Sequence, residues 1–317
     1  MNIKRNPGMP LNTDWIDSIQ VNTSAVERRA SSYSGRRSIK KQHQAAWLLK
    51  AITCIDLTTL SGDDTVQRVR RLCQKAKNPV RKEILEGLDV SKLNLKTGAV
   101  CVYHEMLEAA STYLKGTGID LAAVSTGFPA GLTPFDLRLE EIKKSVAAGA
   151  TEIDIVISRR LVFSQNWQGL YDEIKAFREA CGEAHMKAIL ATGELSTLRN
   201  VAKASMVCMM AGSDFIKTST GKEKVNATLP VSLVMVRMIR EYYERTGYKI
   251  GYKPAGGIST AKQSLLYLTL MKEELGRDWM EPELFRFGAS SLLGDIERQL
   301  EHHLTGRYSA SFRHAMC

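Results

Sequence analysis

A lysine inside an apolar segment is the feature of this 317-residue sequence that most directly indicates chemistry. In GSDFIKTSTGKE, residues 212–223, Lys217 directly follows Phe215 and Ile216, which are typical of a buried strand. Because burying an unpaired ammonium group is costly, such a lysine reaches solvent, pairs with a carboxylate or loses its proton. A neutral amine can attack a carbonyl carbon and form a Schiff base, so Lys217 is a candidate nucleophile.

A second lysine and an aspartate share this setting. Lys253 lies in KIGYKPAGG and Asp154 lies in TEIDIVIS. Side chains alternate along a strand, so Asp154 faces away from Ile153 and Ile155, which suit packing under helices. On neighbouring strands the two lysines would repel, and with partial burial one pKa should fall from about 10.4 toward neutrality. Asp154 could then act as a general base or orient a water, although a purely structural ion pair with one lysine is the other interpretation.

Eight short apolar or β-branched runs carry these residues, and a turn and an amphipathic helical pattern follow each run. The runs span residues 51–60, 98–103, 121–129, 150–158, 186–194, 213–221, 249–257 and 284–291. Such alternation fits an open doubly wound sheet or a closed barrel. The count of eight, and the absence of GxGxxG after the first run, favour a (β/α)₈ TIM barrel with its site at the C-terminal ends of the strands.

The chain divides into three predicted parts. Residues 1–45 form a basic helical N-terminal extension, residues 46–306 form the barrel, and residues 307–317 form a C-terminal tail. The extension holds eight Lys or Arg residues against three acids, within a net charge of +10 for the whole chain. This charge raises the possibility of nucleic-acid binding, but packing on the barrel exterior or on another subunit is the favoured interpretation.

Composition excludes several other classes of protein. The hydrophobic fraction of 44% and the charged fraction of 25% are those of a globular protein, and no apolar run is long enough to span a bilayer. The N-terminus has no apolar signal region, so we expect a cytoplasmic protein. Six cysteines are scattered singly, without the spacing of a zinc site, and this predicts no structural metal and no disulfide framework.

Three turns rich in glycine and serine could bind the other end of a substrate. They are STGK after the sixth predicted strand, AGGI after the seventh and GASS after the eighth, at the ends of the corresponding runs. Backbone N–H groups at such turns bind phosphate, and the loops after strands 7 and 8 are the usual phosphate site of this barrel. Ordinary strand–helix turns are the alternative interpretation of each turn taken alone.

Five motifs in order, DLTTL, EIDIVI, FIKTSTGK, KPAGGI and GASSLL, resemble the deoxyribose-phosphate aldolase family of class I aldolases over residues 46–306. The length is similar to that of the animal form of the family. The resemblance implies that Lys217 forms the Schiff base, that Lys253 depresses its pKa and that Asp154 is the acid/base partner. It also implies a set of substrate-binding residues: Asp56, Thr58, Thr220, Gly221, Lys222, Gly256, Gly257, Ser290 and Ser291.

The implied reaction is the reversible cleavage of 2-deoxy-D-ribose 5-phosphate to D-glyceraldehyde 3-phosphate and acetaldehyde, in deoxyribonucleotide catabolism. No metal or cofactor is expected, because the iminium supplies the electron sink. The expected partner is a phosphorylated sugar, with no membrane or nucleic acid, and the expected assembly is a homo-oligomer, most simply a dimer. A transaldolase, or a sugar-phosphate aldolase with another donor, is the alternative. The tail residue Tyr308 leaves open whether the C-terminus reaches the site.

Overall fold

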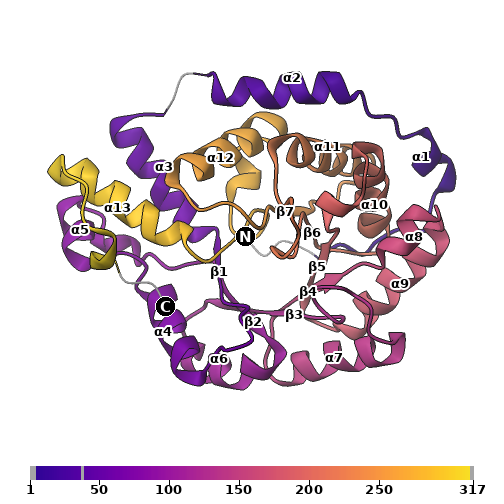
Figure 1. The fold of residues 1–317 in the computed structure, drawn as a ribbon, viewed down its shortest axis with the longest axis horizontal. Helices are drawn as coiled ribbons and strands as arrows, with labels where there is room; N and C mark the ends of the chain where they lie inside the picture. The colour runs from indigo at the N-terminus through magenta and orange to yellow at the C-terminus, as the bar shows by residue number, and fades with distance from the viewer. Residues whose placement is uncertain (1–4, 37–38, 315–317) are drawn as a thin grey trace.

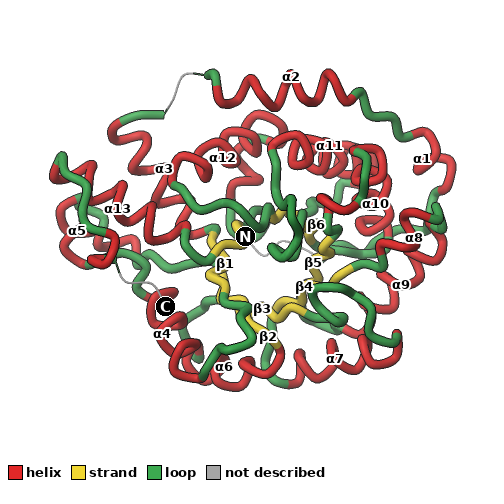
Figure 2. Tube along the Cα trace, in the orientation of Figure 1, coloured by secondary structure: helices red, strands yellow, loops and turns green. Residues whose placement is uncertain are grey.

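Eight parallel strands form the centre of the computed structural model, which describes residues 5–36 and 39–314 (Figures 1 and 2). The strands are β1 (Ile55–Thr58), β2 (Ala99–Tyr103), β3 (Asp120–Val124), β4 (Glu152–Val156), β5 (His185–Ile189), β6 (Phe215–Lys217), β7 (Gly251–Lys253) and β8 (Phe287–Ala289). Each overlaps one of the eight predicted runs, so the predicted barrel is confirmed. The first run began too early, because residues 51–53 end helix α3 (Lys41–Thr53).

The barrel closes between its seventh and eighth strands. The strands pair in the order β7-β6-β5-β4-β3-β2-β1-β8. The two ends of this series meet through the parallel bridges Tyr252–Phe285 and Ala255–Gly288. The N–H of Arg286 also donates to the carbonyl oxygen of Tyr252 at 3.1 Å. These bonds satisfy backbone groups that an open sheet would leave unpaired at its two edges.

Helices surround the strands on the outside (Figure 2). Besides α3, they are α1 (Thr13–Ser18), α2 (Thr23–Ser34), α4 (Val66–Lys77), α5 (Lys82–Gly87), α6 (Leu107–Leu114), α7 (Phe135–Ala147), α8 (Arg159–Phe163), α9 (Trp167–Ala180), α10 (Leu198–Met210), α11 (Leu229–Thr246), α12 (Ala261–Leu275) and α13 (Leu292–Thr305). Thr197, Thr228 and Thr260 cap α10, α11 and α12, since each side-chain oxygen accepts a bond from the backbone N–H three residues later.

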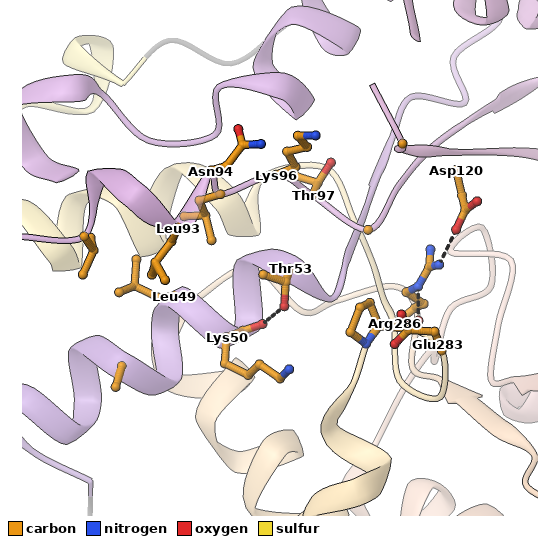
Figure 3. Close-up of a pocket in the computed structure, with 16 residues that line it drawn as sticks. Leu49, Lys50, Thr53, Leu93, Asn94, Lys96, Thr97, Asp120, Glu283 and Arg286 are labelled. Carbon is orange, nitrogen blue, oxygen red and sulfur yellow. Dashed lines mark hydrogen bonds and ion pairs between the residues drawn. The ribbon is translucent and has the colours of Figure 1, made fainter. Parts of the chain in front are cut away.

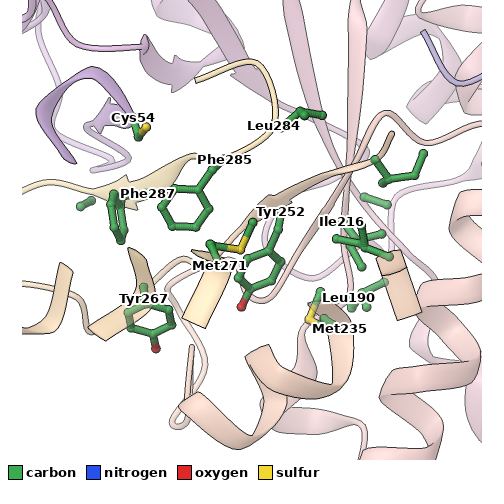
Figure 4. Close-up of a cluster of buried hydrophobic side chains, with 14 of the residues drawn as sticks. Cys54, Leu190, Ile216, Met235, Tyr252, Tyr267, Met271, Leu284, Phe285 and Phe287 are labelled. Atoms are coloured by element: carbon green, nitrogen blue, oxygen red, sulfur yellow. The ribbon is translucent and has the colours of Figure 1, made fainter. Parts of the chain in front are cut away.

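Side chains alternate along each strand, so one face of the strand packs against the helices and the other face points into the barrel. Figure 4 shows Ile216 of β6 and Tyr252 of β7 in the apolar layer between strands and helices. The Tyr252 hydroxyl donates to Ser232 Oγ of α11 at 2.5 Å, which satisfies its polar end inside that layer. The next residue in each strand, Lys217 and Lys253, therefore points the opposite way, into the barrel.

The N-terminal segment lies along the outside of the helical layer (Figure 1). Helix α2 packs on α11 and α12, and α1 lies against α10. Trp15 is buried and stacks on Tyr242 of α11, with 6.3 Å between ring centroids. Tyr33 donates to Glu274 of α12 at 2.9 Å, and Arg29 pairs with the same carboxylate at 3.1 Å. Part of the basic charge of this segment is therefore neutralised by α12. The predicted boundary after residue 45 falls inside α3.

Candidate active site

A pocket of about 370 Å³ opens at the C-terminal ends of β1, β6, β7 and β8. Of the predicted site residues, its wall includes Thr58, Lys217, Thr220, Gly221, Lys222, Gly256, Gly257 and Ser290. Asp154 and Lys253 are fully buried beside it. Ser291 is exposed as the N-cap residue of α13 and is not part of the pocket wall.

One carboxylate oxygen joins the two lysines. Strands β6 and β7 pair with Lys217 opposite Lys253. Each ammonium nitrogen lies 2.7 Å from Oδ2 of Asp154, and all three side chains are almost completely buried. An ion pair is therefore present, as the structural interpretation expects. Lys217 also borders the pocket, however, and a purely structural pair would not require this position.

The two lysines differ in the direction of their pKa shifts. Burial lowers the pKa of Lys217, and although Asp154 acts to raise that pKa, repulsion from Lys253 lowers it further. Burial also opposes the charge of Lys253, but the carboxylates of Asp154 and Asp56 raise its pKa well above the usual range. Lys217 is therefore the lysine from which a proton is more easily removed.

Asp154 remains an anion in spite of its burial. Burial alone would raise its pKa, but Lys217 and Lys253 hold that pKa well below the usual range. Its second oxygen, Oδ1, is buried and accepts no hydrogen bond from any residue within 5–36 or 39–314. This oxygen lies 3.3 Å from Lys187 Nζ and can still accept a hydrogen bond, for example from a water.

Asp56 lies below the pocket rather than in its wall. Its Oδ2 accepts a bond from Lys253 Nζ at 2.5 Å, and its Oδ1 accepts one from Arg286 Nη1 at 2.7 Å. Burial opposes its charge, yet the charges of Lys253 and Arg286 lower its pKa below the usual range. Asp56 therefore stabilises the charged form of Lys253, and it reaches the pocket only through that lysine.

Three buried charged residues were missed by the sequence analysis. Lys187 of β5 contacts Glu152 and lies 3.3 Å from Asp154 Oδ1. Arg286 pairs with Glu152 Oε1 at 3.0 Å. Alternation could have indicated Glu152, two residues before Asp154, and Lys187, which lies in the fifth run. Arg286 lies between Phe285 and Phe287 in the eighth run, so alternation could have indicated it as well.

Close backbone approach requires glycine in the turn after β7. Gly256 and Gly257 both have φ of +78°. A side chain at Gly256 would also begin 2.6 Å from Cγ of Asn226. Across the pocket, Lys222 Nζ donates to the carbonyl oxygen of Leu60 at 2.9 Å. The turns after β1, β6 and β7 are thus held close together around the opening.

A larger pocket, of about 640 Å³, lies at the opposite end of the barrel (Figure 3). Leu49 and Leu93 contribute to its apolar part, and at its polar end Arg286 pairs with Asp120 at 2.9 Å. None of the predicted site residues lines this pocket. The presence of Lys217, the candidate nucleophile, identifies the smaller pocket as the candidate active site, and Arg286 connects the two ends through Asp56.

The described part of the C-terminal tail packs against α13. The ring of Tyr308 stacks on His302 with 4.0 Å between centroids, and 63% of Tyr308 is exposed. His314 is buried and contacts Glu301 at 2.8 Å. Tyr308 therefore does not line the pocket in this structure.

Cys101 lies inside the barrel beside Ala122 and Val124, and burial raises its pKa to about 11. Cys317, one of the six cysteines counted in the sequence, lies outside the described residues. Within the described ranges, no set of three His, Cys, Asp or Glu side chains is arranged to hold a metal ion. In the same ranges, no helix has the length and apolar character needed to cross a bilayer.

The family is shown by comparison with known proteins. Residues 50–292 match the description "DeoC/LacD family aldolase". The chain belongs to this aldolase family. Proteins of Bos taurus and Homo sapiens named deoxyribose-phosphate aldolase are each 60% identical over 305 and 307 residues, with 96% of both chains covered. The predicted resemblance is confirmed, and the chain is an aldolase.

Solved structures share the barrel at lower sequence identity. A putative deoxyribose-phosphate aldolase from Toxoplasma gondii superposes with a TM-score of 0.71 at 19% identity, covering 86% of this chain and 99% of that one. The deoxyribose phosphate aldolase of Aeropyrum pernix gives 0.58 at 22% identity, covering 83% of this chain and 98% of that one. At these identities the likeness supports the fold alone.

Proposed function

We propose that this aldolase cleaves 2-deoxy-D-ribose 5-phosphate reversibly into D-glyceraldehyde 3-phosphate and acetaldehyde, through a Schiff base at Lys217. The observation that carries the proposal is the position of Lys217, a lysine of lowered pKa that borders the pocket and shares Asp154 with a charged Lys253. The names of the relatives with 60% identity support the choice of substrate.

The proposed reaction begins when neutral Lys217 adds to the C1 aldehyde and the adduct loses water to give an iminium. The C3 hydroxyl then passes its proton to a water held by the Asp154 carboxylate. As the C2–C3 bond breaks, its electrons move into the iminium and form an enamine, and glyceraldehyde 3-phosphate leaves. Protonation of the enamine at C2 and hydrolysis of the resulting iminium release acetaldehyde and restore the amine.

The phosphate is proposed to bind at the turns after β7 and β8, next to Lys222. Gly256, Gly257, Lys222 and Ser290 all line the pocket at this side. Backbone N–H groups and an ammonium group together suit a doubly charged phosphate. The substrate would then extend from the turns to Lys217 with its aldehyde toward Asp154.

Borohydride reduction with deoxyribose 5-phosphate tests the Schiff base. The expected result is a stable adduct of the substrate carbons on Lys217, and no adduct in Lys217→Arg. Labelling confined to Lys253 or Lys222 would contradict the assignment. The trapping experiment does not separate this reaction from a transaldolase or another sugar-phosphate aldolase, so acetaldehyde is tested separately as the donor in synthesis.

A homo-oligomer is the proposed assembly, and the relative from Aeropyrum pernix is described as a tetramer. A monomer by analytical ultracentrifugation would contradict this proposal. The dimer expected from the sequence, the role in deoxyribonucleotide catabolism and the cytoplasmic location stay predictions.

A further inference from the structure

The turn between β6 and α11 contains a carboxylate that is bound to its own backbone. Glu223 Oε1 accepts a hydrogen bond from Thr220 N at 3.0 Å. Its Oε2 accepts bonds from Thr220 N at 3.1 Å and Gly221 N at 3.2 Å. Successive N–H groups that converge in this way form a concavity that binds anions. In this chain the Glu223 carboxylate already occupies the concavity, while Thr220 and Gly221, whose N–H groups it binds, line the pocket together with Lys217.

The turn is ordered so that Glu223 keeps this position. Gly221 has φ of +85°, and Lys222 N donates to Thr220 Oγ1 at 3.1 Å. Asn226 Nδ2 donates to the carbonyl oxygen of Glu223 at 2.9 Å, which fixes the backbone on the other side. Hydrogen bonds to an ionised carboxylate are about twice as strong as those between neutral groups. Glu223 is therefore part of the turn rather than a freely moving surface side chain.

The other two turns differ from this one. Across the part of the chain that the structure describes, no acceptor contacts the backbone N–H groups of Gly256, Gly257 or Ser290. A phosphate that enters the pocket therefore meets open donors on the β7 and β8 side. On the β6 side it meets donors that are already bonded, and a negative charge behind them.

We propose that Glu223 is a specificity-determining residue that directs the substrate phosphate to the β7 and β8 turns and limits the affinity for phosphate. The inference rests on the phosphate site proposed above. It adds that the Glu223 carboxylate competes with the substrate phosphate for backbone N–H groups in the same pocket. The Glu223 carboxylate repels a second anion and holds the N–H groups of Thr220 and Gly221, so phosphate cannot bind all three turns together. The consequence is weaker retention of the phosphorylated product.

Glu223→Gln tests the proposal, because glutamine keeps an oxygen that can accept a backbone N–H bond but loses the charge. Calorimetric titration with inorganic phosphate at constant ionic strength should give a Kd about tenfold lower than that of the unaltered protein, equivalent to about 1.4 kcal/mol. The KM for deoxyribose 5-phosphate should also fall, and by a larger factor than the KM for unphosphorylated deoxyribose.

Glu194→Gln is the matched control. Glu194 lies in the loop between β5 and α10, at the same end of the barrel, and pairs with Arg159 at 3.1 Å instead of with backbone N–H groups. Its replacement removes the same charge, so phosphate affinity should stay unchanged if the effect of Glu223 is local. An equal gain in both variants would show a general effect of net charge and would overturn the proposal.

Unchanged or weaker phosphate binding in Glu223→Gln would also overturn it, since a carboxylate with a purely structural role does not compete with phosphate. Thermal unfolding shows whether this variant is folded. If it is not, phosphate affinity is compared between Glu223→Asp, which keeps the charge on a shorter side chain, and Glu223→Ala, which removes the charge. Borohydride trapping with unphosphorylated deoxyribose reports on Lys217 alone. Its failure would contradict the proposed function, and the calorimetric result would still decide the role of Glu223.

Discussion

Replacing Lys253 with leucine tests how the structure lowers the pKa of Lys217. Both ammonium nitrogens lie 2.7 Å from the same oxygen of Asp154, so they are close neighbours. Two unit charges about 5 Å apart, at an effective dielectric constant of about 20, repel by about 3 kcal/mol. Leucine removes this repulsion, and the Asp154 carboxylate then pairs with Lys217 without competition from Lys253. Both changes raise the pKa of Lys217.

The loss of activity follows from this repulsion. A raised pKa leaves more of Lys217 protonated at neutral pH, and a protonated amine cannot attack the aldehyde. Since about 1.4 kcal/mol corresponds to a factor of ten, the neutral fraction should fall by about a hundredfold. The acidic limb of the pH profile of kcat/KM should move to higher pH, and part of the activity should return there. Recovery should be incomplete, because leucine cannot transfer a proton as Lys253 could.

The assay is the pH dependence of kcat/KM for deoxyribose 5-phosphate, together with the rate of borohydride trapping at Lys217. Lys253→Arg is the control, because arginine keeps the positive charge, so the acidic limb should stay where it is even if the maximum falls. A Lys253→Leu profile that drops in height without moving to higher pH would refute the role of repulsion. Burial of Lys217 beside Phe215 would then be the sole cause of its lowered pKa.

Two further predictions concern the charges around the pocket. Asp56→Asn removes a buried carboxylate that contacts Lys253 and Arg286, so the free energy of unfolding in denaturant should fall by about 3–5 kcal/mol. Because the folded state lowers the pKa of Asp56, its stabilisation is present above its unfolded pKa, about 4, and is lost as pH falls toward the folded value, so the difference should shrink in acid. Ser290→Glu places an anion at the proposed phosphate turn and should raise KM for deoxyribose 5-phosphate far more than for free deoxyribose. An equal rise for both substrates would place the phosphate elsewhere.

The directions of the reactive side chains could be predicted because a strand has a fixed period of two. Alternation requires Asp154 to face away from Ile153 and Ile155, and it requires Lys217 to face away from Ile216. The structure places both charged side chains in the barrel interior. Eight strand–helix units were visible for a similar reason, since each apolar run ends at a turn that starts a helix.

Depth inside the barrel could not be predicted in this way. Asp56 and Thr58 share a face of β1, and alternation gives no reason to separate them. In the structure Thr58 lines the pocket, whereas Asp56 lies one layer lower with Arg286. The layer that a residue joins depends on the stagger between strands, which is set by the closure of the whole barrel. The partners of Lys187 and Glu152 were missed for the same reason.

The balance of charges inside the barrel gives a reason why Lys217 is the lysine that we expect to lose its proton. In the cluster inside the barrel, the almost fully buried cations are Lys187, Lys217, Lys253 and Arg286, and the almost fully buried carboxylates are Asp56, Glu152 and Asp154. The fourth carboxylate, Asp120, has a side chain that is 46% exposed, so water weakens its contribution.

An uncompensated positive charge in a medium of low dielectric is unfavourable, and the cost disappears when one of the cations becomes neutral. Arginine does not lose its proton in proteins. Lys187 and Lys253 each contact more than one carboxylate, whereas Asp154 is the one carboxylate that Lys217 contacts among residues 5–36 and 39–314. Deprotonation at Lys217 therefore costs the fewest ion pairs, and it occurs at the lysine that borders the pocket.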